Sequence, residues 1–241
     1  MNVYETHNIG TLLSGNTYPG RGVIIGKSAD GRYAVTAYFI MGRSANSRNR
    51  VFVEKPDTHE VIIYPFDASK VEDPSLIIYS PIRVWENKLI VTNGDQTDTV
   101  YNFVKDGKSF EEALETRCFE PDPPNFTPRI SGMITFKKSD FSYKMSILKS
   151  ADPEGTACNR HTYSYAALPG LGHFIHTYMC DGNPIPTFCT EPERIYIPND
   201  IDAFTADIWN NLNEQNKISM YVRYVDLSTG EEQNRMINKN K

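Results

Sequence analysis

The segment Val23-Ile-Ile-Gly-Lys-Ser-Ala-Asp-Gly-Arg-Tyr-Ala-Val-Thr-Ala-Tyr-Phe-Ile-Met41 decides the fold class of this chain. It contains two β-rich runs, at residues 23–25 and 33–41, and the turn signal Ala29-Asp-Gly31 lies between them. A short turn between two such runs is typical of a hairpin in an antiparallel sheet. The segment therefore predicts a protein built on antiparallel strands.

The same alternation of β-rich runs and turn signals continues along the chain. Further turn signals are Glu86-Asn87, Asp106-Gly107 and Asp181-Gly-Asn183. We expect more strands at residues 51–53, 61–64, 76–79, 88–91, 133–136, 143–148, 174–180 and 218–225. So many strands require at least one large, mostly antiparallel sheet.

Two helices are expected beside the strands. Ser109 and Glu112 form an S-x-x-E capping box, which predicts a helix over residues 109–117. Residues 201–215 predict an amphipathic helix, because four apolar side chains recur at three- and four-residue spacing. These side chains are Ile201, Phe204, Ile208 and Leu212.

The composition bounds the class of protein. The chain has 241 residues, of which 39% are hydrophobic and 12% aromatic, so it can bury a full core. We expect one domain over residues 1–241, with a core at 18–227, a fixed proline-dense loop at 120–128 and a frayed tail at 229–241. No apolar run is long enough for a membrane span and no export signal is evident, so we expect a cytoplasmic protein without membrane contact.

The cysteines suggest neither a metal site nor a disulfide framework. Cys118, Cys158, Cys180 and Cys189 form no C-x-x-C pair, and we expect free thiols, some of them buried.

Arginines cluster directly after the opening hairpin. Arg43, Arg48 and Arg50 lie close together in a chain whose formal net charge is −5. Each guanidinium offers a planar fork of donors that matches phosphate or carboxylate oxygens. Neutral donors stand between them, namely Ser44, Asn46, Ser47 and Asn49. The segment favours a small phosphorylated ligand, and the alternative is a solvated loop whose arginines pair with surface carboxylates. A pI near 5.6 argues against a general nucleic-acid binder.

Four polar segments framed by glycine or proline interrupt the strands, at residues 18–22, 42–50, 92–98 and 120–131. Glycine lets backbone N–H groups approach a ligand, and proline fixes a loop before binding. Arg21 and Arg129 add fixed charge to the arginine cluster. If residues 48–50 are extended, Arg48 and Arg50 lie on one side of the strand and can clamp one phosphate.

Carboxylates in these segments supply groups for acid–base chemistry. Asp95 and Asp98 lie in the third segment, and Glu120 and Asp122 lie in the fourth. A carboxyl group near a dianionic phosphate has its ionised form disfavoured, which raises its pKa toward the range useful for proton transfer. The alternative for Asp95 is that it caps the turn after Asn93-Gly94.

The histidines predict neither catalysis nor a metal site. His161, His173 and His176 lie in aromatic, strand-like runs, where core or edge positions are expected, while His7 and His59 suggest surface positions. The chain has no H-x-x-x-H or H-E-x-x-H spacing and no glycine-rich nucleotide motif, so we expect no metal and no cofactor.

Four motifs in order resemble the archaeal-type IMP cyclohydrolase family and its bacterial relatives. They are Pro-Gly-Arg-Gly (19–22), Gly-Arg-Ser-x-x-Ser-Arg-Asn-Arg (42–50), Thr-Asn-Gly-Asp-Gln-Thr-Asp (92–98) and Asn-Phe-Thr-Pro-Arg-Ile-Ser-Gly (125–132). The resemblance covers residues 18–227. It implies an α+β fold of four αββα layers, like that of the N-terminal nucleophile hydrolases, with two antiparallel sheets between helical layers.

The resemblance also implies a reaction. The family closes the ring of the 5-formamidoimidazole-4-carboxamide ribotide to give IMP and water, as a hydrolase acting on cyclic amidines in purine biosynthesis. For this reaction we expect proton transfer by Glu120 or Asp122, and oxyanion stabilisation by Arg129, Asn93 or the Tyr79 hydroxyl. We expect a further set of residues to bind the purine ribotide, namely Arg21, Arg43, Ser44, Arg48, Asn49, Arg50, Asn93, Asp95, Asp98, Asn125 and Thr127.

Two other functions remain open on the sequence. One is a ribotide-binding module without turnover, which would keep the phosphate contacts and lack the proton-transfer groups. The other is an amide hydrolase activated by chain cleavage before Thr11 or Thr156, since residues 1–3 offer no nucleophile. Self-association is possible at a free strand edge or face.

Overall fold

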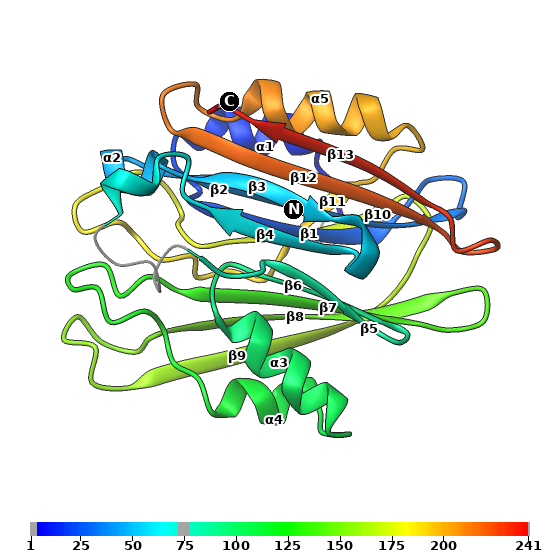
Figure 1. Cartoon of the computed structure of the whole chain (residues 1–241), viewed down its shortest axis with the longest axis horizontal. Helices are drawn as coiled ribbons and strands as arrows, with labels where there is room; N and C mark the ends of the chain where they lie inside the picture. Colours follow the sequence, from blue (N-terminus) through cyan, green and yellow to red (C-terminus); the bar gives the residue numbers. More distant parts are fainter. Residues whose placement is uncertain (1–3, 72–77, 241) are drawn as a thin grey trace.

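The computed structural model describes residues 4–71 and 78–240, and its elements form four layers. Two antiparallel sheets pack face to face, and a pair of helices covers the outer side of each sheet (Figure 1). The expected αββα arrangement of an α+β fold is confirmed.

The first sheet has six strands in the order β11-β10-β1-β2-β12-β13. The opening segment forms its central hairpin, in which Val23 of β1 pairs with Tyr38 of β2. The strands are β1 (Arg21–Lys27), β2 (Tyr33–Met41), β10 (Leu171–His176), β11 (Glu193–Tyr196), β12 (Lys217–Asp226) and β13 (Glu232–Asn238).

The second sheet has seven strands in sequence order, β3-β4-β5-β6-β7-β8-β9. Each strand pairs antiparallel with the next one along the chain. The strands are β3 (Val51–Lys55), β4 (Glu60–Tyr64), β5 (Ile82–Trp85), β6 (Lys88–Thr92), β7 (Arg129–Phe136), β8 (Phe141–Ser150) and β9 (Cys158–Ala166).

Side chains of successive residues in the central strands enter different cores, because a strand alternates its faces. Val23 and Ile25 of β1 join the core between the two sheets, while Ile24 joins the core under the first helical layer. In β6, Leu89 lies between the sheets and Ile90 lies under the second helical layer. Strands that are apolar on both faces therefore specify a sandwich with helices on both sides.

The helical layers complete the outer cores. α1 (Ile9–Gly15) and α5 (Ile201–Asn211) cover the six-stranded sheet. α3 (Gln96–Lys105) and α4 (Phe110–Glu115) cover the seven-stranded sheet. α4 begins with the predicted capping box, in which Ser109 and Glu112 exchange hydrogen bonds. Short helical turns are α2 (Ala45–Arg48) and the 3₁₀ turns η1 (Pro56–Thr58) and η2 (Ala68–Lys70).

The tail at residues 229–241 differs from the prediction. It was expected to be frayed, but residues Glu232–Asn238 form β13 and pair with β12. The run Glu-Gln-Asn-Arg lacks strong β formers, so cross-strand pairing on the edge of the sheet overrides its local preference.

Other boundaries differ by a few residues. The helix expected over 201–215 ends at Asn211, and the strand expected over 174–180 ends at His176. Of the strand expected over 76–79, residues 76 and 77 lie outside the described residues, and Ile78 and Tyr79 are in a loop. β5, β11 and β13 were not predicted.

The cysteines are free, as expected, but the expectation that some are buried is wrong. Cys118, Cys180 and Cys189 are exposed, and Cys158 is half-buried.

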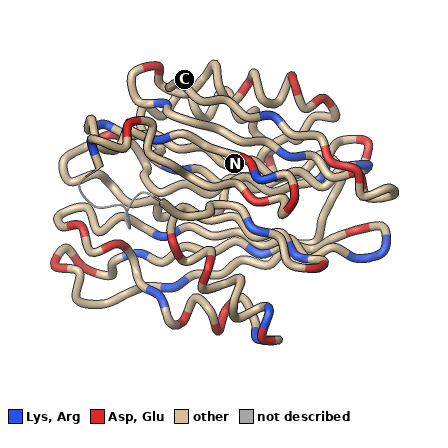
Figure 2. Tube along the Cα trace, in the orientation of Figure 1, with Lys and Arg blue, Asp and Glu red and all other residues tan. Residues whose placement is uncertain are grey.

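Within the described part of the chain, no helix is both long and apolar enough to cross a membrane. Charged residues of both signs are interspersed over the two sheets (Figure 2).

Candidate active site

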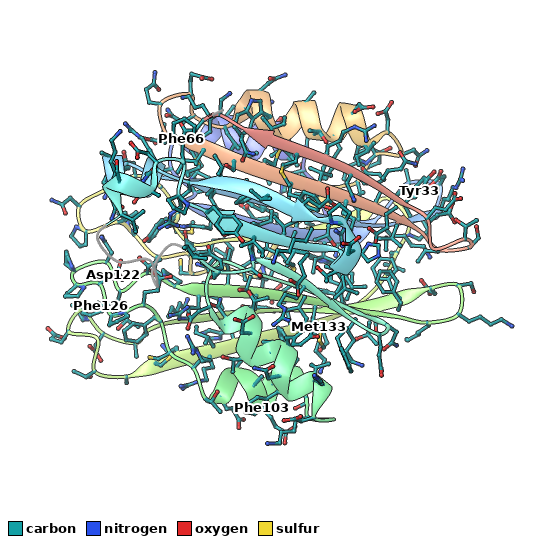
Figure 3. All side chains as sticks on the ribbon, viewed as in Figure 1. Tyr33, Phe66, Phe103, Asp122, Phe126 and Met133 are labelled. Carbon is teal, nitrogen blue, oxygen red and sulfur yellow. The ribbon has the colours of Figure 1, made fainter. Side chains whose placement is uncertain are left out.

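The polar segments meet around a cavity of about 530 Å³. Asp122 and Phe126 mark the end of the sandwich where the loop before β7 runs (Figure 3). The cavity is lined by Tyr18, Arg21, Arg43, Ser44, Asn46, Ser47, Arg50, Tyr79, Gly94, Asp95, Glu120, Pro121, Asp122, Asn125, Thr127, Arg129, Tyr178 and Ile185. The topology thus brings residues from all four predicted segments to one place.

Arg21 and Arg50 place two positive charges on the cavity wall. Arg21 begins β1, and Arg50 directly precedes β3 and is 9% exposed. Neither guanidinium has a hydrogen bond or ion pair with a described residue, and the Arg50 Nε is fully buried without a partner. Burial, together with the nearby positive charge of Arg21, lowers the pKa of Arg50. Two adjacent guanidiniums without a partner among the residues that the structure describes favour an anionic ligand.

Arg43 and the α2 turn border the cavity beside this pair. Ser44 caps α2, and its hydroxyl accepts a hydrogen bond from the Ser47 N–H. Arg43 donates to Asp181 Oδ1 at 2.7 Å, and its guanidinium lies 5.2 Å from the Tyr18 ring centroid. The Ser44 hydroxyl donates to Ser47 Oγ at 3.0 Å, so the Ser47 hydroxyl is the neutral donor that this turn adds to the charged wall.

Glu120 and Asp122 have different surroundings although they are two residues apart. The Glu120 carboxyl has no hydrogen bond with a described residue, and burial raises its pKa although Arg21 and Arg129 act in the opposite direction. Both carboxylate oxygens of Asp122 are occupied by Thr127: Oδ1 accepts from its N–H at 2.6 Å and Oδ2 from its hydroxyl at 2.5 Å. Glu120 is therefore the carboxyl group that remains free to exchange a proton with a ligand.

Arg129 is held by the start of α3. Its Nη1 donates to Asp95 Oδ1 at 2.6 Å and to Gln96 Oε1 at 2.7 Å. Although burial acts in the opposite direction, Arg129 and Arg117 hold the pKa of Asp95 below its usual range. A Cβ on Gly94 would lie 2.5 Å from Arg129 Nη1 and 2.6 Å from Gln96 Oε1, so a larger residue there would displace the two side-chain ends that bond each other.

Tyr79 lies at the cavity wall, and its hydroxyl proton is already donated in a hydrogen bond within the protein. Its hydroxyl donates to the Asn93 carbonyl at 2.8 Å, so the Tyr38 hydroxyl at 3.1 Å must be the donor to Tyr79. To stabilise an oxyanion as a donor, the Tyr79 hydroxyl would first have to leave the Asn93 carbonyl.

Four residues expected to bind the ligand lie outside the cavity lining. Arg48 does not share a side with Arg50, because it ends α2 and donates to the Gly42 carbonyl. Asn49 fixes the loop at Asp67 through two hydrogen bonds. The remaining two are Asn93, whose side chain bonds Pro128, Gln96 and Ile130, and Asp98, which pairs with Arg83 on the surface.

Tyr18, Tyr178 and Ile185 line the cavity but were not predicted from the sequence. The rings of Tyr18 and Tyr178 stack with centroids 5.8 Å apart. Gly20 brings the two segments together: its φ is +78°, and a Cβ there would lie 2.2 Å from Thr177 Oγ1. The motif Pro-Gly-Arg-Gly indicated the first segment, but no local signal connects it with residue 178.

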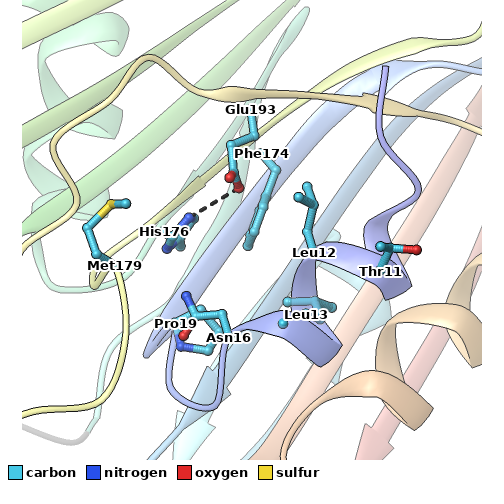
Figure 4. A pocket seen from close by; sticks show the side chains of 10 residues that line it. Thr11, Leu12, Leu13, Asn16, Pro19, Phe174, His176, Met179 and Glu193 are labelled. Atoms are coloured by element: carbon cyan, nitrogen blue, oxygen red, sulfur yellow. Dashed lines mark hydrogen bonds and ion pairs between the residues drawn. The ribbon is translucent and has the colours of Figure 1, made fainter. Parts of the chain in front are cut away.

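A second cavity of about 280 Å³ is lined in part by Pro19 and Met179, which are chain neighbours of Tyr18 and Tyr178 in the first (Figure 4). In its wall, His176 faces Glu193 with Nε2 and Oε2 3.3 Å apart. The core and edge positions expected for His173, His176 and His161 are confirmed, as are the exposed positions of His7 and His59. Neither candidate cleavage site contributes to the main cavity, since Thr11 lies in α1 and Thr156 in an exposed turn.

No group of three or more His, Cys, Asp or Glu side chains suited to a metal ion occurs in residues 4–71 and 78–240.

Comparison with known families adds an independent finding. The family model described as IMP cyclohydrolase-like protein matches residues 18–231. This range contains every segment that contributes to the main cavity.

Three curated relatives carry the name IMP cyclohydrolase. The chain is 30% identical to that of Methanococcus aeolicus over 199 residues, covering 79% of this chain and 88% of the relative. It is 32% identical to that of Methanopyrus kandleri over 186 residues, covering 71% of this chain and 89% of the relative. The match to that of Methanosphaera stadtmanae is shorter, with 33% identity over 126 residues, covering 50% of this chain and 59% of the relative.

Proposed function

We propose a function that proceeds from one premise: this chain belongs to the IMP cyclohydrolase-like family. It is an enzyme of the hydrolase class acting on cyclic amidines, and it closes the ring of the 5-formamidoimidazole-4-carboxamide ribotide to give IMP and water in purine biosynthesis. The substrate is a small purine ribotide, and the site of action is the cytoplasm. The observation that carries the proposal is one cavity that combines a Glu120 carboxyl of raised pKa with the guanidiniums of Arg21 and Arg50, which no described residue pairs.

The 5′-phosphate of the substrate pairs with Arg21 and Arg50. A dianion would neutralise two charges that the described residues leave without direct partners. Ser47 in α2 adds a hydroxyl donor, since the Ser44 hydroxyl donates its own proton to Ser47 Oγ, and Arg43 adds charge at the same wall. This placement leaves Glu120 and Arg129 for the reacting end of the substrate.

Ring closure joins the carboxamide nitrogen to the formyl carbon of the same molecule. Since both groups belong to one substrate, orientation and charge stabilisation provide most of the rate. Negative charge develops on the formyl oxygen, and Arg129 lines the cavity with Nε and Nη2 free of hydrogen bonds to described residues. Arg129 is thus the donor best suited to this charge.

Glu120 exchanges protons with the reacting atoms. Its raised pKa favours the protonated form, which can give a proton to the formyl oxygen, and the resulting carboxylate can take a proton back when water leaves. Asn125 and Thr127 support the loop that carries Glu120, because Asn125 Oδ1 accepts from the Ile185 N–H and the Thr127 carbonyl accepts from the Glu120 N–H.

An ultraviolet absorbance assay tests the proposal. The purified protein is mixed with the formamidoimidazole carboxamide ribotide without added metal, and IMP formation is compared with the uncatalysed closure. We expect the rate to rise in proportion to the protein concentration. IMP binding without acceleration would replace the enzyme by a ribotide-binding module, and an unshortened chain by intact mass in the active sample excludes activation by cleavage.

A further inference from the structure

The hydroxyl of Tyr178 belongs to a hydrogen-bonded chain that ends at a carboxylate. Tyr178 lines the main cavity, and its hydroxyl oxygen lies 2.7 Å from Thr127 Oγ1. Thr127 Oγ1 in turn lies 2.5 Å from Asp122 Oδ2. The three side chains all line the cavity and form one continuous hydrogen-bonded chain along its wall.

The chemistry of these groups fixes the direction of the hydrogen bonds. A carboxylate accepts only, so the single hydroxyl proton of Thr127 goes to Asp122. Thr127 must therefore accept from Tyr178. Burial raises the pKa of Tyr178 to about 12, so the phenol keeps the proton that it donates. The phenol oxygen has no donor among the described residues, which leaves its lone pairs available to an N–H or O–H group of a ligand.

The protein holds Tyr178 in place from the side of the second cavity. Its carbonyl oxygen accepts from His176 Nδ1 at 2.8 Å, and Figure 4 shows His176 facing Glu193. Its ring stacks on Tyr18. A residue supported on two sides and linked through its hydroxyl to a carboxylate is positioned for a defined contact with a ligand.

We propose that Tyr178 is a further catalytic residue, whose oxygen accepts a proton from the carboxamide nitrogen and whose own proton passes through Thr127 to Asp122. The proposal rests on the cyclohydrolase function. In the closing step the N–C bond forms and one N–H bond breaks, Asp122 becomes a carboxylic acid, and Glu120 gives its proton to the formyl oxygen. Loss of water reverses both transfers: the proton on Asp122 returns along the chain to the leaving hydroxyl, and Glu120 takes the N–H proton of the former formamide.

This division gives the two carboxyl groups different functions. In this cycle Asp122, which accepts two hydrogen bonds from Thr127, starts as the carboxylate, and Glu120, whose carboxyl has no hydrogen bond with a described residue, starts as the acid. Both return to their starting states after one turnover, so the cycle needs no further reactant.

Four variants test the chain of hydroxyl groups. Tyr178→Phe keeps the stacked ring and removes the hydroxyl, and Thr127→Val keeps the shape and removes the relay. Thr127→Ser keeps the relay hydroxyl. The matched control is Tyr224→Phe, since the Tyr224 hydroxyl donates to the Pro198 carbonyl and does not line the cavity. The readouts are kcat for ring closure, the Kd for IMP and the solvent deuterium isotope effect on kcat.

We expect Tyr178→Phe and Thr127→Val each to lower kcat about 100-fold. The Kd for IMP should stay within about threefold, the isotope effect should change, and Thr127→Ser should retain at least a third of the rate. Unchanged kcat in Tyr178→Phe would overturn the relay while leaving the cyclohydrolase in place. Equal losses of kcat in Thr127→Ser and Thr127→Val would also overturn the relay, because both losses would then result from a change in the structure of the loop. A wild-type chain without cyclisation activity would overturn the function and the relay together.

Discussion

Two arginine sites in this molecule differ in how the positive charge of a buried guanidinium is compensated. Arg223 in β12 is fully buried, and its Nε and Nη2 donate to the Tyr221 hydroxyl and other protein acceptors, with only Nη1 left without a partner. The carboxylates of Glu54 and Glu232 lie within 3.6 Å of it. Arg21 and Arg50 line a cavity, and their guanidiniums have no hydrogen bond or ion pair with a described residue.

The difference distinguishes an arginine that stabilises the fold from an arginine that binds a ligand. A buried cation costs free energy unless it is paired, and at Arg223 the protein supplies the partners. At Arg21 and Arg50 no described residue supplies a hydrogen bond or ion pair, so we assign the compensation of their charge to a ligand. Changes at the two sites should therefore have opposite consequences for stability and for binding.

The largest effect is expected at the carboxyl group beside the unpaired arginines. Glu120→Gln removes the exchangeable proton and should lower kcat by about 10²–10⁴-fold. The Kd for IMP should change by less than about threefold, because the phosphate contacts remain. Steady-state kinetics and IMP titration measure both quantities, with the exposed Glu115→Gln as the control. Near wild-type turnover in Glu120→Gln would move the proton transfer to another group.

The next effect concerns stability at the paired arginine. Arg223→Met leaves the carboxylates of Glu54 and Glu232 without their cation and should lower the free energy of unfolding by about 3–5 kcal/mol. Urea unfolding followed by circular dichroism measures the loss. IMP binding by the folded protein should be unchanged, and a loss of IMP affinity would show that the two sites are coupled.

Replacing arginine by methionine at Arg50 should affect IMP binding rather than stability. Arg50→Met removes one charge-assisted contact with the ligand phosphate and should weaken IMP binding about 10–100-fold. Its free energy of unfolding without ligand should be equal to that of the wild type or higher, because a buried charge next to Arg21 is removed. Destabilisation as large as that of Arg223→Met would contradict the distinction between the sites.

The smallest effect is a pH dependence of stability. Since the pKa of Glu120 is raised in the folded state, the folded chain binds more protons than the unfolded chain above the ordinary carboxyl pKa. The free energy of unfolding should therefore fall as the pH rises from about 4.5 through the raised pKa, by about 1.4 kcal/mol for each unit of pKa shift. Urea titrations from pH 4.5 to 8 should show this contribution in the wild type and not in Glu120→Gln. Parallel curves for the two proteins would exclude a raised pKa at this position.

Much of the fold could be predicted from the sequence, because alternating apolar residues and turns act locally. The hairpin of β1 and β2 and the capping box of α4 follow from neighbouring residues. β13 could not be predicted in this way, since its polar residues become a strand only by pairing with β12. α3 was not predicted from the sequence, because its first turn belongs to the polar segment 92–98.

The candidate site was predictable in its segments but not in its individual contacts. Arg50 and Arg48 have the same local chemistry, and only the α2 turn capped by Ser44 directs one to the cavity and the other to the Gly42 carbonyl. Tyr178 reaches the cavity through strand pairing across the six-stranded sheet, which no local pattern encodes.

The central claim is that Arg50, which has no hydrogen bond or ion pair with a described residue, binds the ligand phosphate. The most direct measurement is a calorimetric comparison of IMP with inosine, which lacks the phosphate, on the wild type, Arg50→Met and Arg223→Met. We predict that the wild type and Arg223→Met prefer IMP by the same factor, and that Arg50→Met reduces this preference at least tenfold. An unchanged preference in Arg50→Met would contradict the account.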